Sequence, residues 1–267
     1  MYFSECKNIF SVPHRHFFLC RKKGRFVMEG NQKLFKMVFL AFMVALGVVI
    51  SPILRVEGMC PMAHFINVTC AVLMGPYWAF LCALLIGIIR MAVMGIPPLA
   101  LTGAIFGAFL SGMFYRLSKG KLVWAFLGEV IGTGIIGAII SYPVMTFIWG
   151  RSGLTWFFYV PSFIAGTLIG GSIAFIFLRQ LVKAGLLTKF QRALGSATYG
   201  NESDVKNNAI AIGLLGFIAS LVTVVIVHNF VPNPSALVNN LKYIIAAVFI
   251  VIAAIYYALN FRKEAVQ

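Results

Sequence analysis

The chain has 267 residues, of which 61% are hydrophobic and only 11% are charged, and its mean hydropathy is +0.94. Soluble domains carry about 25% charged residues, so this composition excludes a water-soluble fold. The net charge of +15 does not indicate nucleic-acid binding, because the basic residues are not carried by a solvated domain. We therefore expect an all-α integral membrane protein whose surroundings are the lipid bilayer, with no nucleic-acid partner.

Residues 1–33 are predicted to be a basic N-terminal tail. The first 27 residues are basic and aromatic, and they lack the long apolar stretch and the small-residue cleavage site of a secretory signal. Met28 is an alternative start of the protein. In that case residues 1–27 are an artefact of the assigned start or a disordered tail.

Eight apolar segments follow the tail, and each is a predicted membrane span because about 20 apolar residues cross about 30 Å of hydrocarbon. They are Leu34–Leu54, Met59–Met74, Tyr77–Met94, Pro98–Leu117, Leu122–Trp149, Phe157–Leu181, Ala209–Val231 and Leu241–Phe261. The second is the weakest, because it is short and begins close to Arg55 and Glu57. We expect it to be a partial or tilted helix.

One long polar stretch, residues 182–208, divides these segments into two groups. It predicts a cytoplasmic loop between a membrane domain of residues 34–181 and a C-terminal extension of residues 209–267. The expected fold is a six-helix core plus two extra C-terminal transmembrane helices. The aliphatic composition of the extension points to no particular role.

The basic residues indicate the orientation, since Lys and Arg concentrate in the short loops that stay in the cytoplasm. With eight spans and the N-terminus inside, all but four of the 22 Lys and Arg residues fall on the cytoplasmic side. The four at the outer side are Arg55, Arg90, Arg151 and Lys242. We expect a multi-pass protein of the bacterial plasma membrane with both termini in the cytoplasm.

Small residues recur four positions apart inside the predicted spans. The pairs are Ala41 and Ala45, Gly103 and Gly107, Gly128 and Gly132, and Gly166 and Gly170. Such pairs let two helix backbones approach closely. Packing within the chain is the simpler interpretation of any one pair, and a docking face for another membrane protein is the alternative.

Few polar groups lie inside the spans, and each is a candidate for function because ionisable groups are costly in a bilayer. His64 and Asn67 are three residues apart, so they share one helix face near the outer boundary. Together they suit a small heteroaromatic ligand. Alternatively, His64 caps the start of the helix and Asn67 bonds to a neighbouring backbone.

Arg90 and Glu129 are the charged candidates. Arg90 lies near the outer end of the third span, where it either contacts a ligand or extends to the lipid headgroups. Glu129 is the only acid well inside a span, so it needs a partner or a proton. Its partner is either a ligand in a deep cavity or a hydrogen bond to an adjacent helix.

Tyr142 and Trp149 are further candidates for ligand contact, toward the outer end of the fifth span. Pro143 is expected to kink the helix between them and to free backbone carbonyls. The alternative is that these aromatic residues belong to the interfacial belt of the membrane.

Sequence motifs for catalysis are missing, among them a phosphate-binding loop, HExxH, GxSxG and a pair of intramembrane aspartates. Cys60 and His64 are too few ligands for a metal site, and the five cysteines lack the paired spacing of a disulfide framework. We expect no enzyme activity, no cofactor and no metal. Any ATP-driven transport would need another chain to hydrolyse the ATP.

Two stretches of the chain resemble the ThiW family. The first contains His64–Val68 (HFINV), Val72–Ala79 (VLMGPYWA), Ile89–Arg90 and Gly103–Ala108 (GAIFGA), and the second is Gly128–Pro143 (GEVIGTGIIGAIISYP). The resemblance covers roughly residues 34–181. Members of this family are assigned as substrate-binding (S) components of energy-coupling factor (ECF) transporters for hydroxyethylthiazole, the thiazole precursor of thiamine.

The resemblance implies a six-helix S component that captures hydroxyethylthiazole at the outer face and docks against a coupling transmembrane subunit with two ATPase subunits. It also implies that Ala41 and Ala45, an Ala-x-x-x-Ala pattern on the first helix, face the coupling subunit. The ligand contacts that it favours are His64, Asn67, Arg90, Tyr142 and Trp149. The basic tail and the two-helix extension depart from the family pattern.

Other functions stay open at this stage. An autonomous secondary transporter would need coupling acids near the bilayer midplane and an inverted repeat, whereas this chain has Glu129 alone and no visible repeat. A membrane enzyme would need a cluster of catalytic polar groups at one depth. If the chain is an S component, thiamine or a pyrimidine precursor is the alternative ligand.

Overall fold

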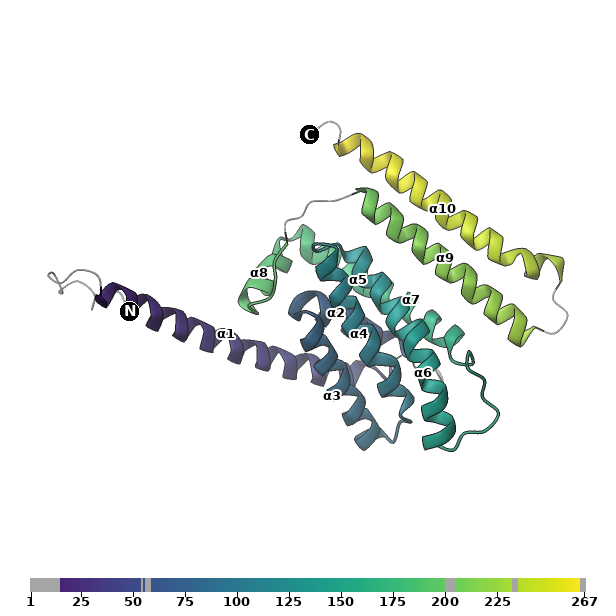
Figure 1. Ribbon diagram of the computed structural model, residues 1–267, viewed down its shortest axis with the longest axis horizontal. Coiled ribbons are helices and arrows are strands. Elements are labelled where there is room, and N and C mark those ends of the chain that lie inside the picture. The colour runs from purple at the N-terminus through teal and green to yellow at the C-terminus, as the bar shows by residue number, and fades with distance from the viewer. Residues whose placement is uncertain (1–14, 54, 56–58, 200–204, 232–234, 265–267) are drawn as a thin grey trace.

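The computed structural model describes residues 15–53, 55, 59–199, 205–231 and 235–264, and its elements are helices joined by loops (Figure 1). Six helices are long and apolar enough to cross a membrane, and two shorter apolar helices accompany them. These eight correspond to the eight predicted segments. The prediction of an all-α integral membrane protein is confirmed.

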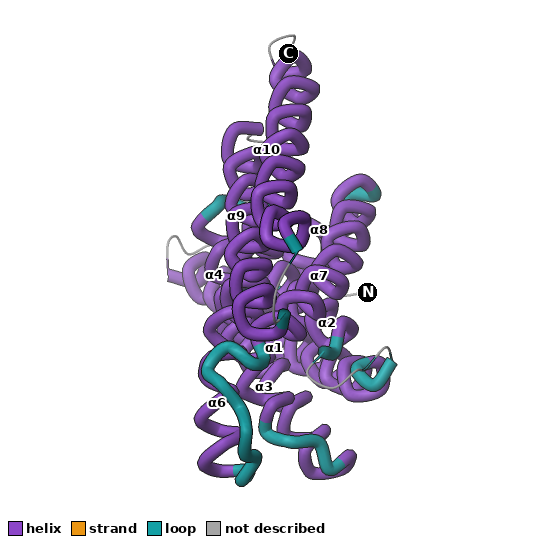
Figure 2. Tube along the Cα trace, turned by 90° about the vertical axis from the view of Figure 1, so that its right-hand side faces the viewer, coloured by secondary structure: helices purple, strands orange, loops and turns teal. Residues whose placement is uncertain are grey.

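The elements follow one another in a simple order along the chain. They are α1 (Arg15–Ile50), α2 (Pro61–Met74), α3 (Pro76–Met94), α4 (Leu99–Leu117), α5 (Leu122–Glu129), η1 (Val130–Gly137), α6 (Ala138–Pro143), η2 (Val144–Ile148), α7 (Val160–Lys183), α8 (Leu186–Ala193), α9 (Val205–Phe230) and α10 (Ala236–Glu264). The loops that follow α3 and η2 lie at the same end of the bundle (Figure 2).

The predicted tail is helical from Arg15 onward, because α1 runs without a break into the first span. Met28, the alternative start, therefore lies within α1. A helix is costly to nucleate and easy to extend, so the apolar span can propagate helix into the basic residues before it. The earlier part of the predicted tail, residues 1–14, lies outside the described residues.

The short helix α2 is the centre of the bundle. Twelve of its 14 residues are buried, and it packs against α1, α3, α4, α5, α7 and α8. At 1.5 Å per residue it rises about 21 Å, which is less than the ~30 Å of a hydrocarbon core. The second segment is therefore a partial helix, as predicted, and space is left beyond its N-terminal end.

The junction between α2 and α3 explains why α2 ends where it does. Gly75 has φ 91°, a conformation that other L residues rarely adopt, and Pro76 then starts α3. A Cβ at Gly75 would also lie 2.5 Å from the guanidinium of Arg116 on α4. The Gly-Pro pair thus turns the chain sharply and keeps α2 short.

The fifth span is one continuous helical run, Leu122–Ile148, in which two stretches are π-helical. The second π-helical stretch, η2, begins directly after Pro143, which has no N–H for a helical hydrogen bond. The first, η1, begins directly after Glu129. Wider π turns are frequent at functional sites, and here η1 directly follows the candidate residue Glu129 and η2 lies between the candidates Tyr142 and Trp149.

Glycines let the helices approach closely, as the four-residue spacing predicts. A Cβ on Gly132 would lie 2.6 Å from the Cα of Gly107, and one on Gly128 would lie 2.5 Å from the carbonyl oxygen of Leu110. Both would therefore collide with the backbone of α4. Gly170 on α7 similarly faces the carbonyl of Pro61 at the start of α2. These glycine pairs serve packing within the chain.

The stretch expected to be a loop, residues 182–208, contains the short helix α8. Its Leu187 and Gln191 are buried, whereas Lys189 and Arg192 are exposed. Gln191 ties the helix to the core, because its Nε2 donates to the carbonyl of Val72 at 2.9 Å. Two turns of amphipathic helix among polar residues give a weak sequence signal, which is why the stretch resembles a loop.

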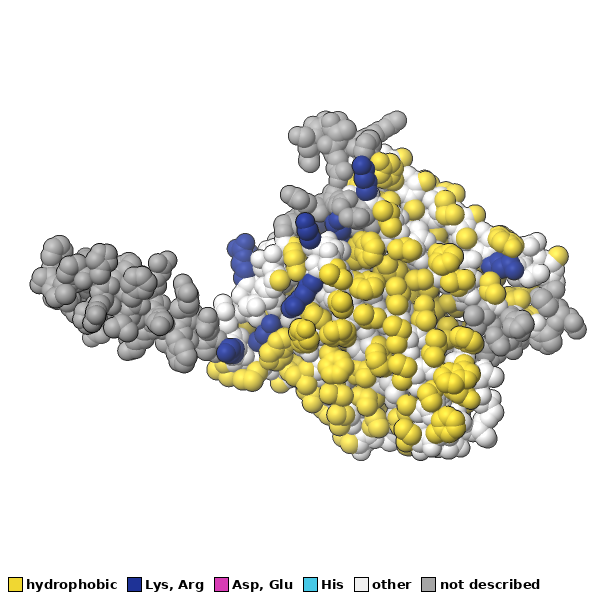
Figure 3. Space-filling model, in the orientation of Figure 1, with side chains coloured by type: hydrophobic (Ala, Val, Ile, Leu, Met, Phe, Trp, Pro, Cys, Tyr) yellow, Lys and Arg dark blue, Asp and Glu magenta, His cyan; other side chains and the backbone are white. Residues whose placement is uncertain are grey.

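Helices α9 and α10 form a hairpin along one side of the bundle (Figure 1). They pack mainly on each other, and α9 also packs against α5 and α7. The face seen in Figure 3 is covered by hydrophobic side chains, and most of the visible Lys and Arg lie along its upper left border. An apolar surface bordered by cations is typical of a protein that contacts lipid.

Candidate functional site

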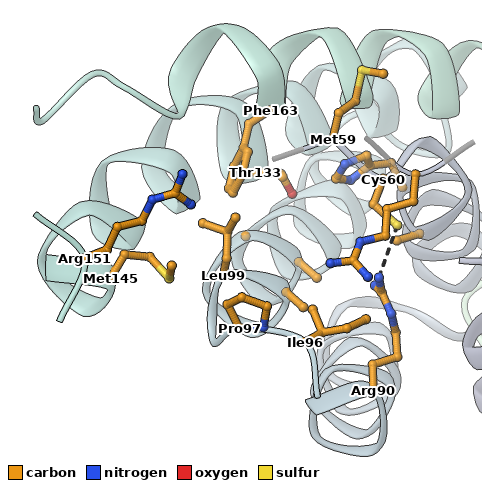
Figure 4. Close-up of a pocket in the computed structure, with 16 residues that line it drawn as sticks. Met59, Cys60, Arg90, Ile96, Pro97, Leu99, Thr133, Met145, Arg151 and Phe163 are labelled. Carbon is orange, nitrogen blue, oxygen red and sulfur yellow. Dashed lines mark hydrogen bonds between the residues drawn. The ribbon is translucent and has the colours of Figure 1, made fainter. Parts of the chain in front are cut away.

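A pocket lies at the end of the bundle where α2 stops short (Figure 4). Its volume is about 80 Å³, and it is lined by residues of α2, α3, α4, η1, η2, α7 and the loops between them. A cavity needs at least about 10–15 Å³ to hold a single water, and this one is several times larger. The pocket therefore suits a small molecule.

The floor of the pocket rests on a buried carboxylate. Oε1 of Glu129 accepts hydrogen bonds from His64 Nδ1 at 2.9 Å, from Asn67 Nδ2 at 3.1 Å and from Thr133 Oγ1 at 3.0 Å. All four side chains are buried. His64 and Asn67 do share one helix face, as their spacing predicts, and that face meets Glu129 across the interface between α2 and the fifth span.

Glu129 sets the orientation of the His64 ring. Because Nδ1–H donates to the carboxylate, Nε2 is the ring nitrogen that the carboxylate does not engage. His64 lines the pocket, so this second nitrogen can serve a ligand as an acceptor when the ring is neutral, or as a donor when it is charged. Glu129 and Asn67 lie beneath the floor of the pocket, and they affect a ligand only through His64.

Space for this network comes from Gly107. A Cβ at this position would overlap the hydroxyl of Thr133 and lie 2.7 Å from Oε2 of Glu129. That second carboxylate oxygen is buried and has no hydrogen-bond partner among the described residues. Any side chain at position 107 would therefore push the carboxylate out of reach of α2.

Arg90 is buried in the wall of the pocket, with only 3% of its surface exposed. Nη2 donates to the sulfur of Cys60 at 3.4 Å, and Nε has no partner among the described residues. Cys60 in turn donates to the carbonyl of Ser51 at 2.9 Å. Arg90 thus does not extend to the headgroups, and its guanidinium retains donors for a bound molecule.

Three of the four cations assigned to the outer side, Arg55, Arg90 and Arg151, line this one pocket. Figure 4 labels Arg90 and Arg151 among them. No acidic residue is among the described residues that line it. Of the three, Arg90 is buried, and its guanidinium favours a ligand that offers hydrogen-bond acceptors. Its charge repels a cation, at roughly 3 kcal/mol for a charge about 6 Å away at an effective dielectric of 20.

The remaining wall of the pocket is apolar. It includes Met59, Met145, Leu99 and Phe163, which approach the cavity from separate elements (Figure 4). Thioether and aromatic groups contact flat, polarisable rings favourably. An apolar wall with a few converging donors is the usual composition of a small-molecule site.

The structure separates the predicted site residues into groups. His64 and Arg90 line the pocket, and Asn67 and Glu129 support it from beneath. Tyr142 and Trp149 are not among the lining residues. Tyr142 packs on Trp156, with ring centroids 4.6 Å apart, and Trp149 is 52% exposed. Both match the alternative interpretation as interfacial aromatic residues.

Sequence reasoning missed Arg55, Arg151 and Thr133 as pocket residues. The two arginines were assigned to membrane topology alone, yet a signal for them exists. An outer-side cation departs from the positive-inside pattern, and three of the four such residues converge here. Thr133 lies one helical turn beyond Glu129, so the same face of the fifth span could have indicated it.

The arrangement of potential metal ligands bears on whether a metal could be bound. Among the described residues, no group of three His, Cys, Asp or Glu side chains is placed to hold a metal ion. His64 and Cys60 both line the pocket, but the first engages Glu129 and the second engages Ser51 and Arg90.

Comparison with known proteins gives one match. The family model described as thiamine-precursor transporter protein (ThiW) matches residues 37–184. No curated protein and no solved structure matches the chain. The matched residues contain α2 to α7 and every residue that lines the pocket, and they end before α9 and α10.

Removing the Glu129 carboxylate is expected to destabilise the fold strongly. Glu129→Ala leaves the buried donors of His64, Asn67 and Thr133 without their acceptor, which should lower the free energy of unfolding by about 3–5 kcal/mol. Thr133→Val is the matched control, since it removes one donor and keeps the shape, and should lower it by about 1 kcal/mol. Thermal unfolding in detergent compares the two variants, and equal effects would contradict the central role of the carboxylate.

Proposed function

Because the chain belongs to the ThiW family of thiamine-precursor transporter proteins, we propose that it is the substrate-binding subunit of an ECF-type importer and that its pocket captures hydroxyethylthiazole. The single observation that carries this proposal is the pocket at the end of α2, with Arg90 buried in its wall and His64 in its floor. Chemistry on the ligand is not part of the proposed role.

The charge of the pocket favours a neutral thiazole over thiamine itself. Hydroxyethylthiazole is uncharged at neutral pH, whereas the thiazolium ring of thiamine carries a permanent positive charge. Arg90, which is buried in the wall of the pocket, would repel that charge. Electrostatic repulsion thus selects the precursor against the finished vitamin.

The chemistry of hydroxyethylthiazole matches the donors and walls of the pocket. Its hydroxyl oxygen and ring nitrogen are acceptors for a guanidinium, and Arg90 has an unused Nε donor. Its sulfur-containing ring can lie against Met59, Met145 and Phe163. Such a ligand would need no counter-ion from the protein.

Delivery into the cell requires partners. We infer that the pocket opens to the outer side and that both termini are cytoplasmic in a bacterial plasma membrane, because this orientation places all but four of the basic residues inside. Ala41 and Ala45 are exposed on α1, next to the exposed apolar side chains of Val38 and Phe42. This uncovered small-residue face supports docking of α1 on a coupling subunit, with ATP hydrolysed by separate ATPase subunits.

Charge at the pocket, rather than charge at the membrane surface, should govern binding. Arg90→Gln removes the buried cation and is expected to weaken hydroxyethylthiazole binding roughly 10- to 100-fold, the usual worth of a hydrogen bond to a charged group. Lys242→Gln is the matched control, because it neutralises the one outer-side cation that does not line the pocket, and its affinity should equal that of the wild type. Equilibrium binding to the purified variants measures both, and unchanged affinity in Arg90→Gln would remove this residue from the site.

Bulky residues on α1 are expected to stop uptake without affecting capture. Ala41→Trp combined with Ala45→Trp fills the exposed small-residue face, which lies outside the pocket lining. Cells that express the complete transporter should lose uptake of labelled hydroxyethylthiazole, whereas the purified variant should bind it as the wild type does. Uptake at the wild-type rate would exclude this face as the docking surface.

A further inference from the structure

Two of the four glycine pairs reach the pocket with one of their members. The inner members are needed inside the bundle, since Gly107 leaves room for the hydrogen bonds of Glu129 and Gly170 leaves room for the backbone of α2. The outer members are Gly103 on α4 and Gly166 on α7. The atoms nearest to a Cβ on either one belong to side chains that line the pocket, so these two positions bear on the shape of the cavity.

Gly103 lies against the ring of Phe163. A Cβ at Gly103 would be 2.8 Å from Cε2 and 3.2 Å from Cζ of that ring, and both residues line the pocket. Phe163 is buried and packs on Tyr159, with ring centroids 5.9 Å apart, so the ring has little freedom to move away. A methyl group at position 103 would therefore take its room from the cavity.

Gly166 lies beside Met59 and His64. A Cβ at Gly166 would be 3.1 Å from Cγ of Met59 and 3.2 Å from Nε2 of His64. The His64 ring is held at Nδ1 by Glu129, whereas the Met59 side chain is flexible and would move first, into the cavity that it lines. The absence of a side chain at position 166 thus keeps the space next to His64 open.

The polar groups of the pocket decide which part of a ligand fills this space. Arg90 is 3% exposed, and its Nε has no hydrogen-bond partner among the described residues. A ligand whose acceptors lie on Arg90 and His64 must place its apolar substituents against the rest of the wall, which includes Leu99 and Phe163 (Figure 4). The ring of hydroxyethylthiazole carries such a substituent, a methyl group, in addition to its hydroxyethyl arm.

We propose that Gly103 and Gly166 are specificity-determining positions, which admit the ligand because they carry no side chain. The ring methyl of the ligand lies at Gly103 against Phe163, and the thiazole ring uses the space that Gly166 leaves beside His64. The inference rests on the proposed function, since it takes the thiazole as the ligand. It adds that selection depends on vacant volume as well as on the donors of Arg90 and His64.

Two probes test the role of Gly103, hydroxyethylthiazole and its analogue without the ring methyl. Equilibrium binding to the purified full-length wild type should favour hydroxyethylthiazole by about tenfold, the usual worth of one buried methyl group. Gly103→Ala should weaken hydroxyethylthiazole binding by about tenfold and keep the analogue within about twofold of the wild type, because the new Cβ takes the place of the ligand methyl. Adding Phe163→Leu to Gly103→Ala should restore most of the lost affinity for hydroxyethylthiazole.

Gly166→Ala should weaken both probes by about the same factor, roughly tenfold, because both carry the thiazole ring. Gly213→Ala is the matched control. It makes the same change in α9, where a Cβ would meet no described atom within 4 Å, and both affinities should equal those of the wild type.

Equal loss of both probes in Gly103→Ala would overturn the proposal, because the glycine would then serve only the fold. Equal affinity of the wild type for the two probes would overturn it as well, as would wild-type affinity in Gly166→Ala. Absence of hydroxyethylthiazole binding by the wild type is a different result, which would contradict the proposed function itself and remove this inference with it.

Discussion

Burial of one carboxylate is the constraint on which the rest of the structure depends. An isolated charge in a membrane interior costs several kcal/mol, so Glu129 must be satisfied by donors that are fixed in place. Its Oε1 receives them from two helices, His64 and Asn67 of α2 and Thr133 of η1. These bonds set the register of α2 against the fifth span. Gly107 on the intervening helix α4 leaves room for them.

The pocket follows from the same arrangement. Because α2 is held deep in the bundle and ends at the Gly75–Pro76 corner, it does not reach across the bilayer, and the space past its N-terminal end becomes a cavity. His64 is then part of the floor rather than of a helix interface. Arg90, which would be expensive to bury against lipid, is accommodated because it faces this cavity and Cys60. Such a site can bind a small molecule that carries several hydrogen-bond acceptors.

Much of the fold could be predicted from the sequence, because membrane spans and glycine pairs are local patterns. The eight apolar segments, the shortness of the second, and the shared face of His64 and Asn67 are all of this kind. The meeting of Glu129 with His64 depends on how two helices are placed against each other, and spacing along one helix cannot show it. Convergence of Arg55 and Arg151 on the pocket depends likewise on two loops folding over one end of the bundle. The short helix α8 was not predicted, because the residues on both sides of it are polar.

The most direct test of the central claim is calorimetric titration of the isolated chain in detergent with hydroxyethylthiazole, thiamine and hydroxymethylpyrimidine, without ATP or partner subunits. If the arginine-lined pocket is the capture site of a thiazole importer, hydroxyethylthiazole binds tightly, and thiamine binds at least about tenfold more weakly because of its positive charge. Binding of thiamine as tight as that of the neutral thiazole, or binding of none of the three, would contradict the assignment of this pocket.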